Sequence, residues 1–550
     1  MRPRTSRLAG GRGYRLIAGP SGVEIESADA AGERHARATL AQAIRLHEGR
    51  CAIPAFAIED WPDFARRGVL LDVSRTKVPT TATLGRMIDL LGGWKYDELQ
   101  LYTEHSFAYR AHEEVWRDAS PITHDEAREL DRRCRERGIE LVPNQQSLGH
   151  MHRWLSRERY RHLAEVPDGI VHAFSREKEP FSLCPTDPAA LELLAGLYDE
   201  LLPCFQSRVM NVGLDETFDI GLGRSKSACE AKGKGRVYLD FLRAVHELAR
   251  ARGHRIQFWG DVILQHPELI EELPRDAVAL LWGYDADHPF EREARAFAES
   301  GLEFRVCPGT SSWQSVAGRT ANAVANLESA AVHGLERGAS GYLVTDWGDR
   351  GHLQPPFASA AGLLYGAGCA WNASAARERA ADLPRLLDAH VFHDPAGVLG
   401  QAAVDLGHVY EVPGSPSTNG SALFFVLAFA DQPLPHARMP GLGVEGLERA
   451  LGRTLEIRAR LGAARGSTLD AEEIRFAADL LAFACRFGRA RLEAPDGAPV
   501  TAIPRAARAA LREELAPLAA EHRRLWVLRN RPGGLDESAS WLERPLALLT

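Results

Sequence analysis

The sequence predicts an α/β protein built around a (β/α)8 TIM barrel, preceded by a small α/β domain and followed by a mostly α-helical C-terminal region. Two observations predict the barrel: eight short apolar or β-branched runs lie between residues 67 and 375, and longer amphipathic stretches separate them. Alternating strands and helices are typical of a parallel sheet, and eight such units over about 300 residues fit a closed barrel. The flanking regions lack this alternation, so we expect domains at 1–63, 64–375 and 376–550.

The predicted barrel strands are the apolar runs. They cover residues 68–73, 98–103, 139–144, 209–214, 255–259, 277–282, 303–307 and 341–346. The stretches between them show the periodicity of helices with one apolar face. The clearest of these helices cover residues 83–91, 125–137, 189–202, 238–252 and 320–333.

The flanking regions show weaker patterns. Before the barrel, residues 23–27 alternate as a strand does, residues 31–32 indicate a turn, and residues 38–46 indicate a helix. After the barrel, amphipathic helices are predicted at 444–461, 471–487 and 506–528. Packing against a core is the expected role of these helices.

The composition excludes several classes of protein. With 45% hydrophobic residues, 25% charged residues and a net charge of -8, the chain resembles a soluble globular protein and lacks the basic stripe of a nucleic-acid-binding protein. The basic N-terminus precedes no apolar stretch of signal-peptide length, and no segment reaches membrane-spanning length, so we expect a cytoplasmic protein without a membrane partner. Eight scattered cysteines without a Cys/His cluster predict reduced thiols, no metal and no cofactor.

Polar residues at the ends of the predicted strands indicate a catalytic site, because active sites of such barrels form at the C-terminal strand ends. The fourth run ends in Asp215 and Glu216. Adjacent side chains leave a strand on opposite faces, so the two carboxylates can take separate roles. An acidic pair is also ordinary at a helix start, so the pair alone does not establish catalysis. Other predicted strand ends carry Asp72, Glu104, His105, Gln145, Gln146, His150, Asp261 and Asp349.

Aromatic residues gather at the same predicted rim. Trp259, Trp282 and Trp347 end or follow strands, and Tyr284 and Trp313 lie in adjacent loops. Aromatic faces stack on the C–H faces of sugar rings, while carboxylates and arginines hold the hydroxyl groups. The combination predicts a sugar-binding pocket, with core packing of the same side chains as the alternative.

Three motifs occur in the order found in a known family. Arg67-Gly-Val-Leu-Leu-Asp-Val-Ser-Arg75 is similar to a first-strand motif, and Asn144-Gln-Gln-Ser-Leu-Gly-His150 stands in the place of a Pro-Gly-His segment. Asn211-Val-Gly-Leu-Asp-Glu216 is similar to a Gly-Gly-Asp-Glu signature. On these motifs the chain resembles family 20 of the glycoside hydrolases, the β-N-acetylhexosaminidases, over residues 14–375.

Three positions depart from the family pattern. Leu214 replaces a glycine, Trp347-Gly-Asp349 stands where Trp-x-Glu is usual, and Trp313 replaces a tyrosine after the seventh strand. These departures, with segments 146–151 and 215–225, look most like the intracellular hexosaminidase D branch. No comparable resemblance covers residues 376–550.

The resemblance implies an exo-acting β-N-acetylhexosaminidase that hydrolyses terminal GlcNAc or GalNAc β-glycosides with retention. In this family the 2-acetamido oxygen of the substrate attacks the anomeric carbon and forms an oxazolinium intermediate. Glu216 is then the general acid and base. Asp215 holds the acetamido N–H and stabilises the developing positive charge.

The resemblance also implies substrate contacts. Arg67 is expected to grip ring hydroxyls through its forked donors, and Asp349 to accept the 4- and 6-hydroxyls. Tyr284 is the candidate to contact the acetamido carbonyl in place of the missing tyrosine. An amino-sugar glycoside is the implied partner, and a homodimer stays open because the family includes dimers. The other predicted substrate-binding residues are Glu104, His150, Trp259, Trp282 and Trp347.

Three other functions remain as alternatives. A metal-dependent barrel hydrolase would need a His-x-His pair at the first strand, where Leu71-Asp72-Val73 offers none. A non-catalytic carbohydrate-binding barrel would not need both carboxylates of the pair. A retaining glycosidase with an enzymic nucleophile would use a second carboxylate instead of the acetamido group. The sequence leaves open the preferred epimer and the aglycone.

Overall fold

An eight-stranded parallel sheet forms the centre of the protein. The computed structural model describes residues 12–47, 52–75, 77–495 and 497–550. Within these residues the strand order of the sheet is β6-β5-β4-β13-β12-β11-β10-β9, and every strand overlaps a predicted run. The predicted fold class is therefore confirmed. The strands are β4 (Arg66–Asp72), β5 (Glu98–Tyr102), β6 (Glu140–Val142), β9 (Val209–Asn211), β10 (Arg255–Trp259), β11 (Val278–Trp282), β12 (Phe304–Cys307) and β13 (Gly341–Asp346).

Backbone hydrogen bonds close the sheet into a barrel between β6 and β9. The Asn211 N–H donates to the Pro143 carbonyl at 2.9 Å, and the Gln145 N–H donates to the Asn211 carbonyl at 3.0 Å. Because the sheet is closed and parallel, the C-terminal ends of all eight strands meet at one mouth. The predicted rim residues can therefore lie together.

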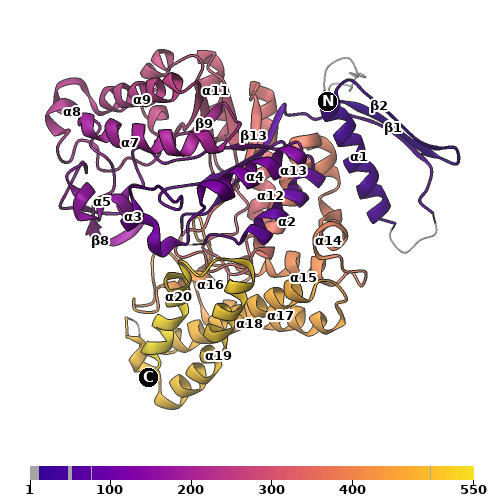
Figure 1. The fold of residues 1–550 in the computed structure, drawn as a ribbon. Helices are drawn as coiled ribbons and strands as arrows, with labels where there is room; N and C mark the ends of the chain where they lie inside the picture. The colour runs from indigo at the N-terminus through magenta and orange to yellow at the C-terminus, as the bar shows by residue number, and fades with distance from the viewer. Residues whose placement is uncertain (1–11, 48–51, 76, 496) are drawn as a thin grey trace.

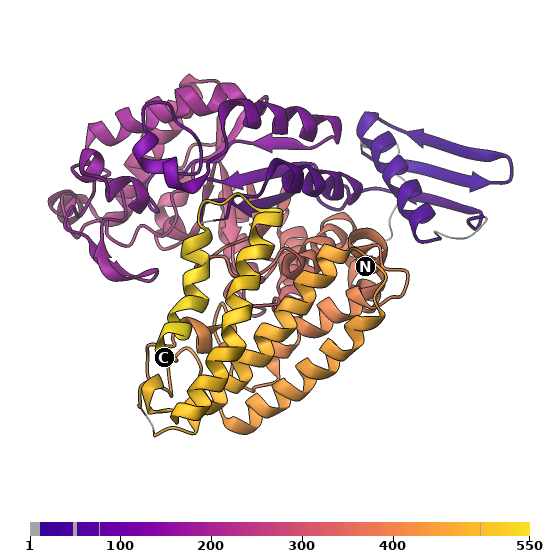
Figure 2. The ribbon, with the colours of Figure 1, turned by 60° about the horizontal axis from the view of Figure 1, so that its bottom comes forward.

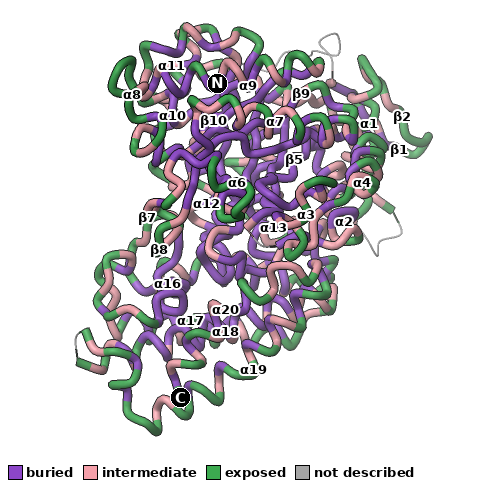
Figure 3. Tube along the Cα trace, turned by 60° about the vertical axis from the view of Figure 1, so that its left-hand side comes forward, coloured by how far each residue is buried: buried purple, intermediate pink, exposed green. Residues whose placement is uncertain are grey.

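Helices surround the barrel on its outer side (Figure 1). Their inner faces and the strands are buried, while their outer faces are exposed (Figure 3). A β-hairpin of β7 (Ile170–His172) and β8 (Ser175–Glu179) follows the third barrel strand at the mouth. The main helices are α2 (Thr81–Gly93), α4 (His124–Glu136), α7 (Pro188–Leu201), α9 (Lys234–Ala251), α11 (Phe290–Ser300), α12 (Thr320–Arg337) and α13 (Phe357–Glu378), and the shorter ones are α3 (Glu113–Trp116), α5 (His152–Leu155), α6 (Glu158–Arg161), α8 (Lys226–Lys232) and α10 (Asp261–Leu264).

A small antiparallel sheet precedes the barrel. Its order is β2 (Gly22–Ser27), β1 (Tyr14–Gly19) and β3 (Phe56–Asp60), and α1 (Ala30–Arg45) lies beside it. The predicted turn at 31–32 is wrong, because the Asp29 side chain accepts the Gly32 N–H at 2.7 Å and starts the helix there. A Cβ on Gly32 would lie 2.3 Å from the Gly13 carbonyl oxygen, so this glycine permits close packing.

The C-terminal region packs as a helical layer beneath the barrel (Figure 2). The three predicted helices are present as α17 (Val444–Arg460), α18 (Thr468–Leu492) and α19 (Arg505–Arg529). The link after α19 pairs with the first barrel loop, since the Thr80 N–H donates to the Arg529 carbonyl at 2.9 Å and the Arg531 N–H donates to the Val78 carbonyl at 2.8 Å. The remaining helices are α14 (Leu383–Leu387), α15 (Leu399–Leu406), α16 (Ala422–Ala428) and α20 (Leu535–Leu548).

The sequence predicts reduced cysteines and no membrane-spanning segment. The seven cysteines within it carry free thiols, and Cys51 lies outside the described residues. None of the described helices combines the length and the apolar character needed to cross a bilayer.

Candidate active site

The backbone after β9 adopts a left-handed path that presents Asp215 and Glu216 at the barrel mouth. Gly213, Leu214 and Glu216 have φ angles of 73°, 74° and 52°. A Cβ on Gly213 would lie 1.7 Å from Gln146 Oε1, so only glycine fits there. Leu214 occupies the position where the family pattern has glycine, and a left-handed conformation costs such a residue roughly 1–2 kcal/mol. The Tyr238 hydroxyl stabilises this turn by donating to the Leu214 carbonyl at 3.1 Å.

The two carboxylates converge on one histidine. His150 Nε2 lies 3.2 Å from Asp215 Oδ2 and 3.2 Å from Glu216 Oε2. Burial alone lowers the pKa of His150, but the carboxylates outweigh it and raise the pKa to about 10. The imidazole is therefore a cation at neutral pH.

Asp215 is held as an anion. Burial opposes its ionisation, but the His150 charge and a hydrogen bond from Gln146 outweigh this effect and lower the pKa. The Gln146 amide donates to Asp215 Oδ1 at 2.7 Å. With both oxygens held, Asp215 is a fixed negative charge beside Glu216, which is more exposed and faces the mouth.

A third carboxylate supports the pair from behind. Asp261 follows β10, and its Oδ2 accepts the Glu216 N–H at 3.0 Å. Burial, and then the Asp215 charge, raise the pKa of Asp261 to about 7. The hydrogen bond fixes the left-handed backbone at Glu216 and thereby aims its side chain.

Glu104 lies on the other side of His150. Its Oε1 is 3.8 Å from His150 Nδ1 and accepts the Tyr102 hydroxyl at 3.0 Å. Glu104 and His150 therefore lie side by side at the rim, where the sequence places both. Because His150 links Glu104 to the Asp215 and Glu216 carboxylates, its orientation is set from both ring nitrogens.

The structure corrects the placement of Arg67. This side chain lies at the opposite, N-terminal end of the barrel, where its guanidinium donates to the Lys95 carbonyl at 2.9 Å and pairs with Asp97 at 3.1 Å. A strand rises about 3.3 Å per residue, so the five residues from Arg67 to Asp72 place roughly 16 Å between the buried arginine and the mouth. Arg67 can contact neither the carboxylate pair nor a sugar bound beside it.

Arg75 is the arginine at the mouth. Its guanidinium lies 3.3 Å from Glu104 Oε1 and 3.5 Å from Asp72 Oδ2, and it stacks on Tyr102 at 4.7 Å and on Trp347 at 5.1 Å. The sequence signal was available, because Arg75 follows the first strand whereas Arg67 begins it. Arg75 is therefore the candidate for the role that was predicted for Arg67.

A matched pair of substitutions tests this correction. Arg75→Lys removes the planar fork, and we expect kcat/KM to fall roughly tenfold to a hundredfold, the effect of losing one charged hydrogen bond. Arg67→Lys should lower the melting temperature and leave kcat/KM within about threefold, because it acts on folding alone. Kinetics and thermal unfolding of both variants check this, and a larger kinetic effect at Arg67 would contradict it.

The predicted tryptophans meet at the mouth. Trp259 and Trp347 have ring centroids 6.1 Å apart, and Tyr284 stacks on Trp282 at 5.2 Å. Tyr284 also meets Trp313 edge to face at 5.0 Å. The Trp259 indole N–H is buried without a hydrogen-bond partner among the described residues. The rings form one aromatic wall beside the carboxylates, where they could hold a sugar as well as pack against each other.

Asp349 lies on the pocket side of this wall. It lines the same cavity as Arg75 and Glu104. Burial raises its pKa to about 6, although Arg75 opposes this effect. Asp349 therefore lies where it is a candidate to accept a hydroxyl group.

The cavity at the mouth measures about 350 Å³. Arg75, Glu104, His150 and Asp349 line it from the barrel, and the β7–β8 hairpin and the C-terminal region supply further lining residues. The C-terminal contribution was not predicted, because nothing in the sequence pairs these distant segments. The lining residues from the C-terminal region are Asn419, Arg438, Glu537 and Trp541, and the hairpin contributes Phe174.

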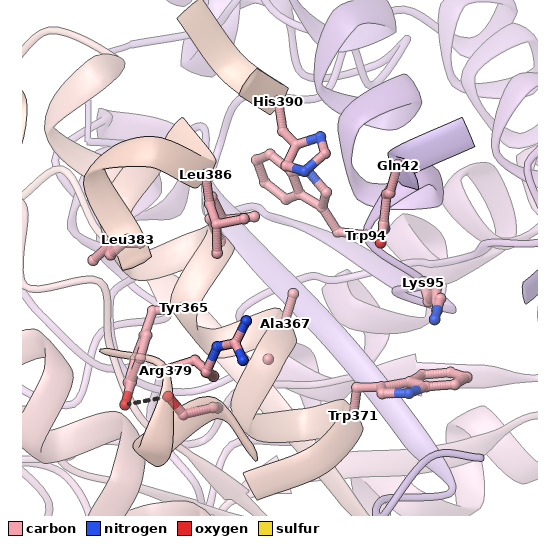
Figure 4. A pocket seen from close by; sticks show the side chains of 13 residues that line it. Gln42, Trp94, Lys95, Tyr365, Ala367, Trp371, Arg379, Leu383, Leu386 and His390 are labelled. Carbon is pink, nitrogen blue, oxygen red and sulfur yellow. Dashed lines mark hydrogen bonds between the residues drawn. The ribbon is translucent and has the colours of Figure 1, made fainter. Parts of the chain in front are cut away.

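A second cavity, of about 200 Å³, lies between α1, α13 and α14 (Figure 4). Trp94, Trp371 and Tyr365 are among its lining residues, and the Lys95 amine lies 4.0 Å from the Trp371 ring centroid. Its lining contains no carboxylate within the described residues. This second cavity therefore offers no carboxylate as a candidate acid.

The only described group of side chains that could hold a metal ion is His150, Asp215 and Glu216, whose ligand atoms lie within 4.8 Å of one another. The same atoms form an ion-paired group, because His150 Nε2 lies 3.2 Å from a carboxylate oxygen of each acid.

A closed (β/α)8 barrel with paired carboxylates and an aromatic wall at its mouth defines a glycosidase class of site. Residues 64–323 match the family model described as "Glycosyl hydrolase family 20, catalytic domain". The barrel of this chain belongs to glycosyl hydrolase family 20.

Individual relatives agree with this family. The chain is 25% identical over 286 residues to a lacto-N-biosidase of Bifidobacterium bifidum, covering 50% of this chain and 24% of the relative. It is 24% identical over 218 residues to hexosaminidase D of Bos taurus, covering 38% and 60%. The chain thus spans less than two thirds of each. A family 20 β-N-acetylhexosaminidase from Streptomyces coelicolor A3(2) shares the fold with a TM-score of 0.55 and 20% identity, covering 74% of this chain and 84% of that one.

Proposed function

We propose that this protein is an exo-acting β-N-acetylhexosaminidase that cleaves terminal GlcNAc or GalNAc β-glycosides with retention of configuration. One observation carries the proposal: an anionic Asp215 and a mouth-facing Glu216 share His150 beside a wall of aromatic rings. Membership of family 20 supports it. A non-catalytic sugar-binding barrel would have no use for the buried charges that fix this pair.

Glu216 acts as general acid and then as general base. Its backbone is fixed by Asp261, and His150 and Glu104 lie behind its carboxyl group. Glu216 donates its proton to the leaving oxygen and later takes a proton from the attacking water.

The acetamido group of the substrate acts as the nucleophile. Its carbonyl oxygen attacks the anomeric carbon, and the leaving group departs with the Glu216 proton to give an oxazolinium ion. Asp215 accepts the acetamido N–H and stabilises the positive charge on that ring, because Gln146 and His150 hold it ionised. Tyr284 is the candidate donor to the acetamido oxygen.

Arg75 and Asp349 bind the ring hydroxyls on the far side of the sugar. They line the cavity at the mouth together and supply donors and an acceptor for hydroxyl groups. Trp259, Trp282 and Trp347 enclose the ring and exclude water. Hydrolysis of aryl N-acetyl-β-hexosaminides tests the proposal, and an enzyme that binds these sugars without cleaving them would disprove it.

Asp349 is expected to accept a hydrogen bond from the 4-hydroxyl and thereby to distinguish the two epimers. This hydroxyl is axial in the galacto sugar and equatorial in the gluco sugar, so a shorter acceptor changes the preferred position. We expect galactosaminides to be at least as good as glucosaminides, and Asp349→Glu to shift the kcat/KM ratio toward the gluco epimer by roughly 1–3 kcal/mol. Both aryl substrates are measured on both enzymes. An unchanged ratio would assign epimer choice to Arg75 or to the loops.

A further inference from the structure

Two hydrogen bonds tie the loop after β4 to the loop after β13. At the start of the first loop, Asp72 Oδ2 accepts the Gly348 N–H at 2.9 Å. Five residues later, the Lys77 amine donates to the Gln354 carbonyl at 2.7 Å. Arg75 lies in the chain between these two bonds, so the backbone that carries its guanidinium is held on both sides.

The C-terminal region covers the second of these bonds. Lys77 is only 5% exposed, and its amine lies 5.2 Å from the centroid of the Trp526 ring of α19. The Arg531 N–H donates to the Val78 carbonyl at 2.8 Å and fixes the residue that follows Lys77. Lys77 therefore lies where the loop after β4, the loop after β13 and the C-terminal helices meet.

An amine at this junction is energetically unfavourable by itself. Burial lowers the pKa of Lys77 to about 7, although the charges of Asp346 and Glu473 oppose this effect. An apolar side chain of similar length would fill the same space without losing the hydration of an amine. What the lysine adds to the junction is therefore its hydrogen bond to the Gln354 carbonyl.

We propose that Lys77 is a positioning residue for Arg75, whose guanidinium it holds at the barrel mouth by tying the two loops together under the C-terminal helices. This inference rests on the proposed function, in which Arg75 binds ring hydroxyls. The guanidinium lies 5.1 Å from the Trp347 ring centroid and 3.3 Å from Glu104 Oε1. Because its donors form a rigid fork, a small displacement of the loop weakens every bond that they make to the substrate.

Substitutions of Lys77 test the bond itself. Lys77→Met removes the donor and keeps the length of the side chain. We expect it to lower kcat/KM for a nitrophenyl N-acetyl-β-glucosaminide about tenfold, the effect of weakening one charged hydrogen bond to the substrate. Lys77→Arg keeps a donor for the carbonyl and should stay within about threefold of wild type. Lys77→Gln, whose shorter side chain withdraws the donor, should match Lys77→Met and replaces it if the methionine variant does not fold.

A double-mutant cycle with Arg75→Met separates positioning from a general structural effect. If Lys77 acts through the Arg75 guanidinium, Lys77→Met should change kcat/KM by less than about twofold once that guanidinium is absent. A general loosening of the mouth would instead lower kcat/KM about tenfold in both backgrounds. Steady-state kinetics of the wild type, the two single variants and the double variant measure the difference.

Lys95→Met is the matched control, because Lys95 is also a buried lysine but lies at the opposite end of the barrel, where its carbonyl accepts from the Arg67 guanidinium. It should lower the melting temperature and leave kcat/KM unchanged. A wild-type kcat/KM in Lys77→Met, or an equal loss in the Arg75→Met background, would overturn the role of Lys77. Wild-type protein that cleaves no aryl N-acetyl-β-hexosaminide would instead refute the proposed function itself.

Discussion

Replacing Glu216 by glutamine is expected to lower kcat on a β-linked disaccharide by roughly 10²–10⁴-fold, the usual contribution of a general acid. The amide keeps the shape of the side chain but has no acidic proton for the leaving oxygen. Sugar binding and the melting temperature should stay close to wild type, because Glu216 is partly exposed and its backbone is held by Asp261. Steady-state kinetics and thermal unfolding measure these effects.

The leaving group provides the internal control for this prediction. Aryl glycosides with acidic phenols need little protonation, so Glu216→Gln should slow them much less than the disaccharide. Glu230→Gln, on the exposed surface of α8, is the matched substitution and should leave both rates unchanged. A near-wild-type rate of the Gln variant on the disaccharide would remove Glu216 from the mechanism.

Asp215→Asn is expected to cost roughly 10²–10³-fold in kcat on N-acetyl substrates, because a neutral amide stabilises the oxazolinium charge poorly. The substitution also removes the carboxylate that raises the pKa of His150, so that pKa should fall. Activity against pH and NMR titration of the His150 ring measure the two effects.

Substrate assistance makes a companion prediction about ligands. Plain β-glucosides and β-galactosides lack the 2-acetamido nucleophile and should be cleaved far more slowly than N-acetyl sugars. A thiazoline mimic of the cyclic intermediate should bind wild type much more tightly than the product sugar, and Asp215→Asn should abolish most of that difference. Equal cleavage of plain glycosides would require an enzymic nucleophile instead.

Local patterns in the sequence determined the barrel and most of its mouth. The apolar runs predict all eight strands because strand periodicity and length are properties of neighbouring residues. Since the C-terminal ends of barrel strands share one mouth, the order of the motifs also brings Glu104, His150, Asp215 and Glu216 together. The prediction of a turn at residues 31–32 was wrong, because the Asp29 side chain caps α1 and these residues belong to that helix.

The tertiary structure decided which residues complete the site. Arg67 and Arg75 lie in one motif, but the direction of β4 places them at opposite ends of the barrel. The hydrogen bond from Glu216 to Asp261 joins residues 45 positions apart, and the bond from Trp313 to Asn419 joins residues 106 positions apart. Such contacts depend on how whole helices and strands pack against each other. Periodicity and spacing describe neighbouring residues only, so they could not predict these contacts.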